Sequence, residues 1–207
     1  MAIAALVMAG GKATRMQAVL EKPLLKIRDR PMINQVIEAL KKSNSVNRII
    51  VAVTPRTRET AQIVRALGVD VMETDGAGYE QDMRQAIKSL GLGDVVVVAA
   101  DLPFLAPTIV DEAVNKYLSS RKPALMVAAP TEVYEKFGLK ASYIFNCKGQ
   151  QVAPVGLNVI DGTRIDEERL EEAIFVIRND DIVFNVNTQI DLELARKHRE
   201  GPKHVEN

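Results

Sequence analysis

The chain has 207 residues, enough for one substantial α/β domain with its own core and too few for two of ordinary size. Lys and Arg number 27, as do Asp and Glu, so the formal net charge is zero, and binding to nucleic acid or an anionic membrane through overall charge is not expected. The single cysteine, Cys147, excludes an internal disulfide and is typical of a cytoplasmic protein. No apolar run reaches the roughly 20 residues of a membrane span, and the apolar start lacks the basic leader of a signal peptide.

The first part of the chain alternates apolar runs with amphipathic segments. Continuous apolar runs predict strands that are buried on both faces, and apolar residues spaced three and four apart predict helices. Strands are expected at 3–8, 48–54, 69–72, 94–100 and 124–129, and helices at about 31–40, 61–67, 79–90 and 107–118. This alternation predicts a mostly parallel sheet with helices on both faces, a Rossmann-like three-layer α/β sandwich.

The pattern loosens in the C-terminal part. We expect a small antiparallel excursion of two strands, then a helix, two short strands and a final helix, followed by a loose polar tail from 201 to 207. In that order, the segments are 143–147, 152–160, 166–173, 175–177, 184–186 and 189–199. No repeat, linker or low-complexity segment divides the chain, so residues 1–207 are expected to form one domain.

The loop after the first strand combines glycines with cations. Gly10 and Gly11 permit backbone turns that side chains forbid, so consecutive N–H groups can face an anion. Lys12, Arg15 and Lys22 add three positive charges within a short span. Backbone donors combined with such cations are suited to a triphosphate. The residues expected to bind the nucleotide here are Ala9, Gly10, Gly11, Lys12, Ala13, Thr14, Arg15 and Lys22.

This loop differs from two familiar phosphate-binding motifs. A Walker P-loop requires a glycine where Leu6 stands, and Ser or Thr where Ala13 follows the lysine, while the dinucleotide motif Gly-x-Gly-x-x-Gly is absent. Instead, residues 8–16 and 21–24 resemble the signature of the nucleotidyltransferase superfamily, approximately Ala-Gly-Gly-x-Gly-x-Arg-Met followed by Lys-Pro-Leu. Ala13 departs from that signature where a third glycine is usual. An ordinary strand-to-helix turn with surface lysines is the alternative.

An aspartate follows the most apolar of the expected strands. Asp101 stands at the carboxyl end of 94–100, where open α/β sheets bind ligands. Mg²⁺ prefers oxygen ligands and takes one or two carboxylates beside phosphate oxygens and water. We expect Asp101 to hold Mg²⁺ or Mn²⁺ against the triphosphate, as the superfamily resemblance also implies, with a turn aspartate before Pro103 as the alternative. Asp75 and Asp82 are expected to be solvated or to act as caps.

A second polar segment lies near the C-terminus. Thr188 is a suitable N-cap for the final helix, and Asp191, three residues later, contributes as in a capping box. The run 185–192 also resembles the Asn-x-Asn-Thr-x-x-Asp-Leu segment of nucleotidyltransferases that modify cofactors. That resemblance implies that Asn187 reaches the metal or the phosphates.

Two further segments narrow the resemblance to one family over nearly the whole chain. Residues 76–82 resemble the Gly-x-Gly-Tyr-x-x-Asp stretch, and residues 152–159 the Pro-x-Gly-x-Asn-Val segment, of archaeal-type GTP:adenosylcobinamide-phosphate guanylyltransferases. The resemblance implies transfer of GMP from GTP to a phosphorylated corrinoid with release of pyrophosphate, a late step of cobalamin assembly. The residues implied for the nucleotide are Thr54, Gly76 and Gly78, and those for the acceptor are Gly156 and Asn158. Turn chemistry alone is the alternative for the glycines.

The implied reaction sets the expected roles of the polar residues. A phosphate acceptor is anionic near neutral pH and needs little help from a general base, so no catalytic histidine is expected, and His198 and His204 are expected to be exposed. Lys12 and Arg15 would hold the β- and γ-phosphates, and Lys22 would stabilise the α-phosphorus during in-line attack. The catalytic residues are therefore expected to be Lys22, Arg15 and Asp101.

Two other functions share these features. A molybdenum cofactor guanylyltransferase or cytidylyltransferase has the same glycine loop, Asp-x-Pro turn and Asn-Thr ending. A non-catalytic nucleotide-binding protein on the same scaffold would bind GTP and release no pyrophosphate. The sequence leaves base selectivity and the oligomeric state open, with a homodimer as one option.

Overall fold

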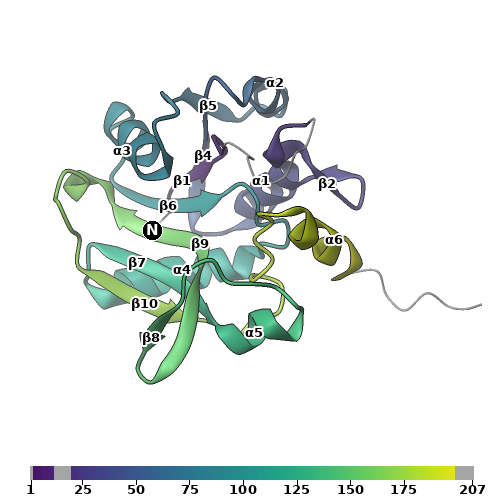
Figure 1. Ribbon diagram of the computed structural model, residues 1–207. Coiled ribbons are helices and arrows are strands. Elements are labelled where there is room, and N and C mark those ends of the chain that lie inside the picture. The colour runs from purple at the N-terminus through teal and green to yellow at the C-terminus, as the bar shows by residue number, and fades with distance from the viewer. Residues whose placement is uncertain (1, 12–19, 199–207) are drawn as a thin grey trace, which may run out of the picture.

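A computed structural model describes residues 2–11 and 20–198. Its centre is an eight-stranded sheet with the order β10-β7-β9-β6-β1-β4-β5, in which β8 pairs with β9 (Figure 1). The strands are β1 (Ile3–Met8), β4 (Val46–Val53), β5 (Asp70–Glu73), β6 (Asp94–Ala99), β7 (Ala124–Pro130), β8 (Phe145–Cys147), β9 (Gln150–Asp161) and β10 (Glu172–Val176). A separate hairpin consists of β2 (Lys26–Ile27) and β3 (Arg30–Pro31).

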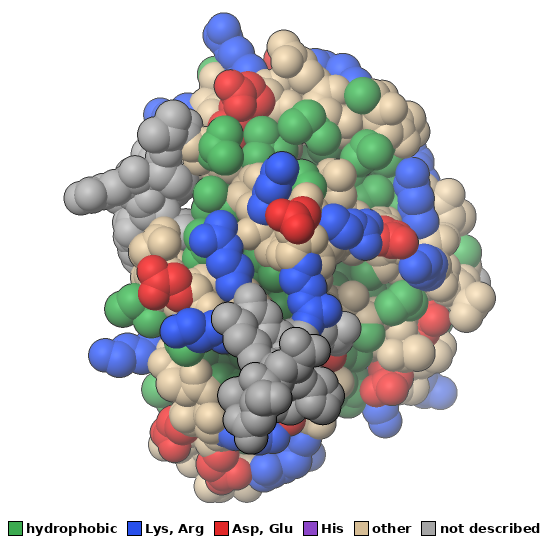
Figure 2. Space-filling model, turned by 90° about the vertical axis from the view of Figure 1, so that its right-hand side faces the viewer, with side chains coloured by type: hydrophobic (Ala, Val, Ile, Leu, Met, Phe, Trp, Pro, Cys, Tyr) green, Lys and Arg blue, Asp and Glu red, His purple; other side chains and the backbone are tan. Residues whose placement is uncertain are grey.

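Helices cover both faces of the sheet, as the sequence predicts. They are α1 (Met32–Lys42), α2 (Arg58–Ala66), α3 (Tyr79–Ser89), α4 (Pro107–Ser120), α5 (Thr131–Lys136) and α6 (Gln189–His198), with 3₁₀ turns η1 (Lys22–Leu24) and η2 (Gly162–Arg164). No helix in the described part of the chain is long and apolar enough to cross a membrane. On the face at the right of Figure 1, where α6 is labelled, Lys and Arg side chains are interspersed with acidic and hydrophobic ones (Figure 2).

The middle of the sheet is parallel and apolar on both faces. β1 runs parallel to β4 on one side and to β6 on the other, so that Leu6 lies opposite both Ile50 and Val97. Leu6 packs with residues of α3 in the smaller core cluster, whereas Val7 packs with α1 and α4 in the larger one. Because these parallel strands end at one edge of the sheet, the segments that follow β1, β4 and β6 meet there.

The antiparallel excursion is confirmed, and it forms part of the main sheet. β9 is antiparallel to β6, β7 and β8. On β7, Met126 pairs with Asn158 and Ala128 pairs with Pro154, so β9 carries two extra residues between these pairs. Gly156 lies in this bulge with a φ of +88°, a conformation that favours glycine.

Two of the elements expected in the C-terminal part are wrong, and one helix was not expected. Residues 166–173 do not form a helix, because the chain turns after η2 and then pairs as β10 in parallel with β7. That tertiary pairing outweighs the local helical preference. Residues 184–186 do not form a strand, because the segment turns and the N–H of Val186 bonds to the carbonyl of Asp101 at 3.1 Å. The short helix α5 follows β7 directly.

His198 is not exposed, contrary to the sequence-based expectation. Its side chain is 12% exposed, and its ring stacks on Phe184 with centroids 4.1 Å apart. Its Nε2 lies 2.7 Å from Asp181. The last turn of α6 therefore docks on an aromatic cluster that also contains Phe104 and Phe137. His204 lies outside the described residues.

Candidate active site at the carboxyl edge of the parallel strands

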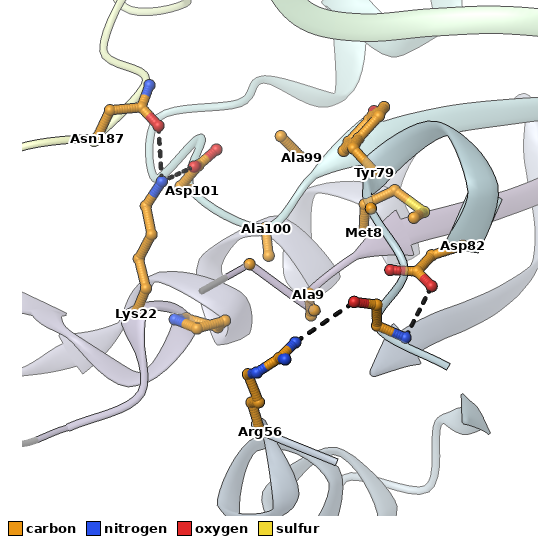
Figure 3. Close-up of a pocket in the computed structure, with 15 residues that line it drawn as sticks. Met8, Ala9, Lys22, Arg56, Tyr79, Asp82, Ala99, Ala100, Asp101 and Asn187 are labelled. Atoms are coloured by element: carbon orange, nitrogen blue, oxygen red, sulfur yellow. Dashed lines mark hydrogen bonds and ion pairs between the residues drawn. The ribbon is translucent and has the colours of Figure 1, made fainter. Parts of the chain in front are cut away.

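The segments after β1, β4 and β6 surround a pocket of about 360 Å³ (Figure 3). This volume is typical of a site for a small molecule. The sequence-predicted residues that line it are Ala9, Gly10, Gly11, Lys22, Gly76, Gly78, Asp101 and Asn187, and Arg56, Tyr79 and Asp82 line it as well. Four further predicted residues, Lys12, Ala13, Thr14 and Arg15, lie outside the described part of the chain.

Three polar side chains from distant parts of the chain meet at one end of this pocket. The ammonium group of Lys22 forms an ion pair with Asp101 and donates to Oδ1 of Asn187 at 2.8 Å (Figure 3). The side chains of Lys22 and Asp101 are only 13% and 14% exposed, so salt screens this pair less than a surface pair. The three residues that the sequence assigns to metal and phosphate are therefore adjacent, and what they bind stays a prediction.

A capping box positions Asn187. Oδ2 of Asp191 accepts from the N–H groups of Asn187 (3.0 Å) and Thr188 (2.8 Å), and the N–H of Asp191 donates to Oγ1 of Thr188 at 3.2 Å. These bonds confirm the expected cap of α6. Together with the bond from Val186 to the Asp101 carbonyl, they hold the segment before α6 against the end of β6.

Glu21 anchors the segment that carries Lys22, and sequence reasoning missed it. Its carboxylate accepts from the N–H groups of Glu59 (2.9 Å) and Thr60 (2.7 Å) and from the hydroxyl of Thr60 (2.6 Å). It thereby satisfies donors at the first turn of α2. Lys22 follows directly in η1, whose second residue is Pro23. The bonds span 38 and 39 residues, so no local pattern indicates them.

A buried carboxylate shapes the opposite end of the pocket. Oδ1 of Asp82 accepts from the N–H groups of Gly76 (2.9 Å) and Ala77 (3.1 Å), and Asp82 is only 5% exposed. Of the two expected roles of Asp82, solvation is wrong, whereas its bonds to the loop before α3 agree with a capping role. Arg56, which also lines the pocket, donates from Nη1 to the carbonyl of Gly76 at 3.4 Å. Arg56 lies three residues after the end of β4, and a cation close to the carboxyl end of a parallel strand is the signal that points to it.

Thr54, directly after β4, contacts the glycine loop and holds it in place. It is 2% exposed, and its hydroxyl donates to the carbonyl of Gly10 at 3.3 Å. A Cβ on Gly10 would lie 2.4 Å from Cγ2 of Thr54. The close approach of the loop to β4 therefore requires glycine at this position. Thr54 acts on the pocket through the backbone it holds.

A smaller pocket of about 220 Å³ shares Asn187 with the larger one. Gly156 lines it together with Pro154, Tyr134 and Tyr143. Burial raises the pKa of Tyr134, which keeps its hydroxyl neutral, and the hydroxyl donates to the carbonyl of Pro154 at 3.2 Å. The structure does not bring the other predicted acceptor residue, Asn158, to the lining of either pocket, since it lies within β9 opposite Val97 and Met126.

A divalent cation would find oxygen donors here without a dedicated cage. Among the residues that the structure describes, no group of three or more His, Cys, Asp and Glu side chains is placed to hold a metal. Asp101 and Asn187 offer one carboxylate and one amide oxygen, and both contact the single ammonium group of Lys22. Since Mg²⁺ usually completes its shell with substrate phosphates and water, this donor set fits a metal shared with a nucleotide.

Comparison with known proteins identifies the class. Residues 5–153 match the family described as the MobA-like NTP transferase domain, so the chain belongs to that family. Its fold is that of a solved CMP:2-keto-3-deoxy-manno-octonic acid synthetase in complex with CTP, with a TM-score of 0.71 over 95% of this chain and 97% of the other, at 16% identity. The nucleotidyltransferase class that the glycine loop predicts is therefore confirmed.

Two named relatives come from Thermococcus species. The probable molybdenum cofactor guanylyltransferase of Thermococcus kodakarensis is 30% identical over 57% of this chain, which spans 55% of that relative. The probable molybdenum cofactor guanylyltransferase of Thermococcus gammatolerans is 28% identical over 92% of this chain and 97% of its own length. These names support the alternative that the sequence left open and do not support the narrower resemblance to corrinoid guanylyltransferases.

Proposed function

We propose that the protein transfers the GMP part of GTP to a phosphorylated acceptor and releases pyrophosphate. The observation that carries this proposal is the cluster of Lys22, Asp101 and Asn187 at one end of the larger pocket. Asn187 also lines the smaller pocket, so a phosphorus atom held by the cluster is accessible from both. Membership of an NTP transferase family supports a nucleoside triphosphate as the donor.

The proposed mechanism uses positioning and charge. An oxygen of the acceptor phosphate bonds to the α-phosphorus of GTP while the bond to the β-phosphate oxygen breaks, and pyrophosphate leaves. The attacking oxygen is already anionic, so no side chain has to remove a proton. Lys22 has three N–H donors and stabilises the charge on the α-phosphate. Lys12 and Arg15 are proposed to hold the leaving pyrophosphate.

Asp101 and Asn187 are the proposed metal ligands. They would hold a divalent ion, Mg²⁺ or Mn²⁺, which when bound neutralises phosphate charge. Lys22 contacts both of these side chains through its ammonium group. Lys22 therefore has to turn its donors toward the phosphates when a nucleotide and metal are bound. The ion pair keeps the buried carboxylate neutralised until then.

The named relatives support a molybdenum cofactor as the acceptor. In that reaction the phosphate of the pterin part of the cofactor would lie at Asn187 and the rest in the smaller pocket. The same relatives favour GTP over CTP, since each is named a guanylyltransferase.

Adenosylcobinamide phosphate is a second candidate acceptor, and a specific observation favours it. Gly76, Gly78 and Tyr79, from one family-like segment, line the larger pocket. Pro154 and Gly156, from the other segment, line the smaller one. The two segments that resemble corrinoid guanylyltransferases therefore both contribute residues to the pockets that the reaction would use.

Pyrophosphate release tests the proposal and separates the acceptors. The protein is incubated with Mg²⁺ and either GTP or CTP, together with molybdopterin, adenosylcobinamide phosphate or no acceptor. We expect release with GTP and only when one of the acceptors is present. Release of pyrophosphate with CTP and an acceptor, but not with GTP, would indicate a cytidylyltransferase. Binding of GTP without release for either acceptor would contradict the proposal and indicate the non-catalytic alternative.

A further inference from the structure

Asp82 is a buried carboxylate, and only one of its two oxygens holds the neighbouring loop. Oδ1 accepts both loop N–H groups, those of Gly76 and Ala77. Within residues 2–11 and 20–198, no donor bonds to its Oδ2. Although the residue is only 5% exposed, Oδ2 keeps some accessible surface, so this free acceptor opens onto space and not onto packed protein. Asp82 lines the larger pocket, so a ligand in that pocket can reach it.

The place of Asp82 within the pocket indicates which part of a nucleotide it meets. Lys22, Asp101 and Asn187 lie at one end of the pocket, and Asp82 lies at the other (Figure 3). In this view its second oxygen, which has no dashed line, points toward the side of the pocket that Met8 and Ala9 line. A nucleotide whose phosphates lie at Lys22 therefore directs its base toward Asp82.

A carboxylate in this position distinguishes the bases by hydrogen-bonding capacity. An ionised carboxylate only accepts hydrogen bonds. Guanine presents two adjacent donors, N1–H and the N2 amino group, whereas adenine and cytosine each present one amino group beside a ring nitrogen that accepts. A buried group aimed at a donor rejects a base that lacks it, because both polar groups then stay unpaired.

We infer that Asp82 is the residue that selects guanine, with Oδ2 accepting from the N1–H and N2–H edge of the base. This inference rests on the proposed function, since it requires a nucleotide in the larger pocket. The Gly-x-Gly loop and Asp82 then act as one unit, in which Oδ1 fixes the loop and Oδ2 contacts the base. Arg56 holds the loop from the other side.

Asp82→Asn separates base recognition from loop support. Its amide oxygen can keep both bonds from Gly76 and Ala77, and its NH₂ group then replaces Oδ2. That NH₂ group repels the amino group of guanine and matches the carbonyl that xanthine carries at the same position. We expect the variant to bind GTP about 100-fold more weakly than the wild type and to bind xanthosine triphosphate more tightly than the wild type does.

The measurement is calorimetric titration of the full chain with each nucleotide and Mg²⁺, without an acceptor. Asp75→Asn is the matched control, because Asp75 is exposed, lies in the same loop and does not line the pocket. We expect this control to bind GTP as the wild type does. Loss of GTP binding in Asp82→Asn without any gain for xanthosine triphosphate would reduce Asp82 to a loop support and overturn the inference.

Inosine triphosphate tests the inference without any substitution. It lacks only the N2 amino group of GTP, so we expect the wild type to bind it about tenfold more weakly. Equal binding of inosine triphosphate and GTP, or equal binding of ATP and GTP, would overturn the role of Asp82 while leaving the proposed transferase intact. A wild type that binds no nucleoside triphosphate would overturn the proposed function itself.

Discussion

The two pockets that share Asn187 are built in different ways. The larger one lies at the ends of parallel strands, where buried side chains pin the loops: Thr54 holds Gly10, and Asp82 holds Gly76. The smaller one lies against β9 and α5, and side chains such as Tyr134 and Tyr143 form its walls. The nucleotide side is therefore shaped largely by backbone that buried side chains hold, with no room for a Cβ at Gly10, and the acceptor side by side chains from separate segments.

This difference predicts that a substitution in one pocket affects the binding of one substrate and not of the other. Changes in the larger pocket should alter the KM or affinity for the nucleotide, and changes in the smaller one should alter the KM for the acceptor. Turnover with both substrates saturating should change only when the cluster at the junction, or a residue that positions it, is altered.

The largest effect is expected at that junction. Asp101→Ala removes the carboxylate that pairs with Lys22, and we expect pyrophosphate release to fall about 10²–10³-fold, the usual loss for one electrostatic contact to a transition state. Steady-state kinetics with both substrates saturating measures it. Lys22→Ala should lower the rate of pyrophosphate release as much. The double variant should lower it little further, because the two residues act as a unit.

Asp166→Ala is the matched control for Asp101→Ala. Asp166 also pairs with a lysine, Lys88, but its side chain is 74% exposed. We expect this control to retain wild-type turnover, and thermal unfolding should show that all four variants remain folded. Wild-type turnover in Asp101→Ala would remove Asp101 from the mechanism.

Gly10→Ala should impair binding of the nucleotide without impairing binding of the acceptor. The new Cβ would lie 2.4 Å from Cγ2 of buried Thr54, and overpacking of this kind typically costs about 1–3 kcal/mol. We expect the KM for GTP to rise about tenfold or more, with the KM for the acceptor unchanged. Initial rates with each substrate varied in turn check this.

Thr54→Ser is the rescue partner, because it removes Cγ2 and keeps the hydroxyl that donates to Gly10. Alone it should bind GTP nearly as well as the wild type, and combined with Gly10→Ala it should restore most of the affinity. A double variant no better than Gly10→Ala would show that the loop is displaced for another reason.

The contrast between the pockets also explains how far the sequence could predict the molecule. The strands and helices of the parallel part, the glycine loop and the Thr188–Asp191 cap depend on residues close together in the chain, and their patterns are readable. The contact of Asp82 with Gly76 spans only six residues, so an aspartate shortly after a Gly-Ala-Gly turn was a usable signal.

Other features depend on contacts that no local pattern records. β10 overlaps the strand expected at 175–177 but begins at Glu172, inside the expected helix, because it pairs with β7, about fifty residues earlier. His198 is mostly covered because Phe184 and Phe137 lie where the last turn of α6 docks. Glu21 meets Thr60 across 39 residues. The roles of Asp101, Asn187, Gly156 and Asn158 stay predictions, since adjacency in a fold does not by itself establish a ligand.

Gly156→Ala should break the acceptor side, with a smaller effect. Gly156 has a φ of +88°, and a Cβ there would meet the amide of Asn185 at 3.0 Å and Ala99 at 3.3 Å. We expect the KM for the acceptor to rise about tenfold or less, and the affinity for GTP to stay unchanged. Gly149→Ala has a similar φ of +85° with no atom within 4 Å, so it should lower stability without changing the acceptor KM.

The smallest effect is expected at Glu21, which touches neither pocket. Glu21→Ala removes the acceptor for donors at the first turn of α2, and loss of such a cap costs about 1 kcal/mol of stability. Because Lys22 follows directly, we also expect turnover to fall, though less than for Asp101→Ala or Lys22→Ala. Urea unfolding and pyrophosphate release measure the two effects separately.

Glu59→Ala is the control that decides between two roles of Glu21. It removes an exposed carboxylate from the same end of α2 and leaves the backbone bond to Glu21 in place. We expect it to change neither stability by more than a few tenths of a kcal/mol nor turnover. If Glu21→Ala loses stability but keeps full turnover, then the anchor serves only the helix, and the position of Lys22 is set by its own contacts with Asp101 and Asn187.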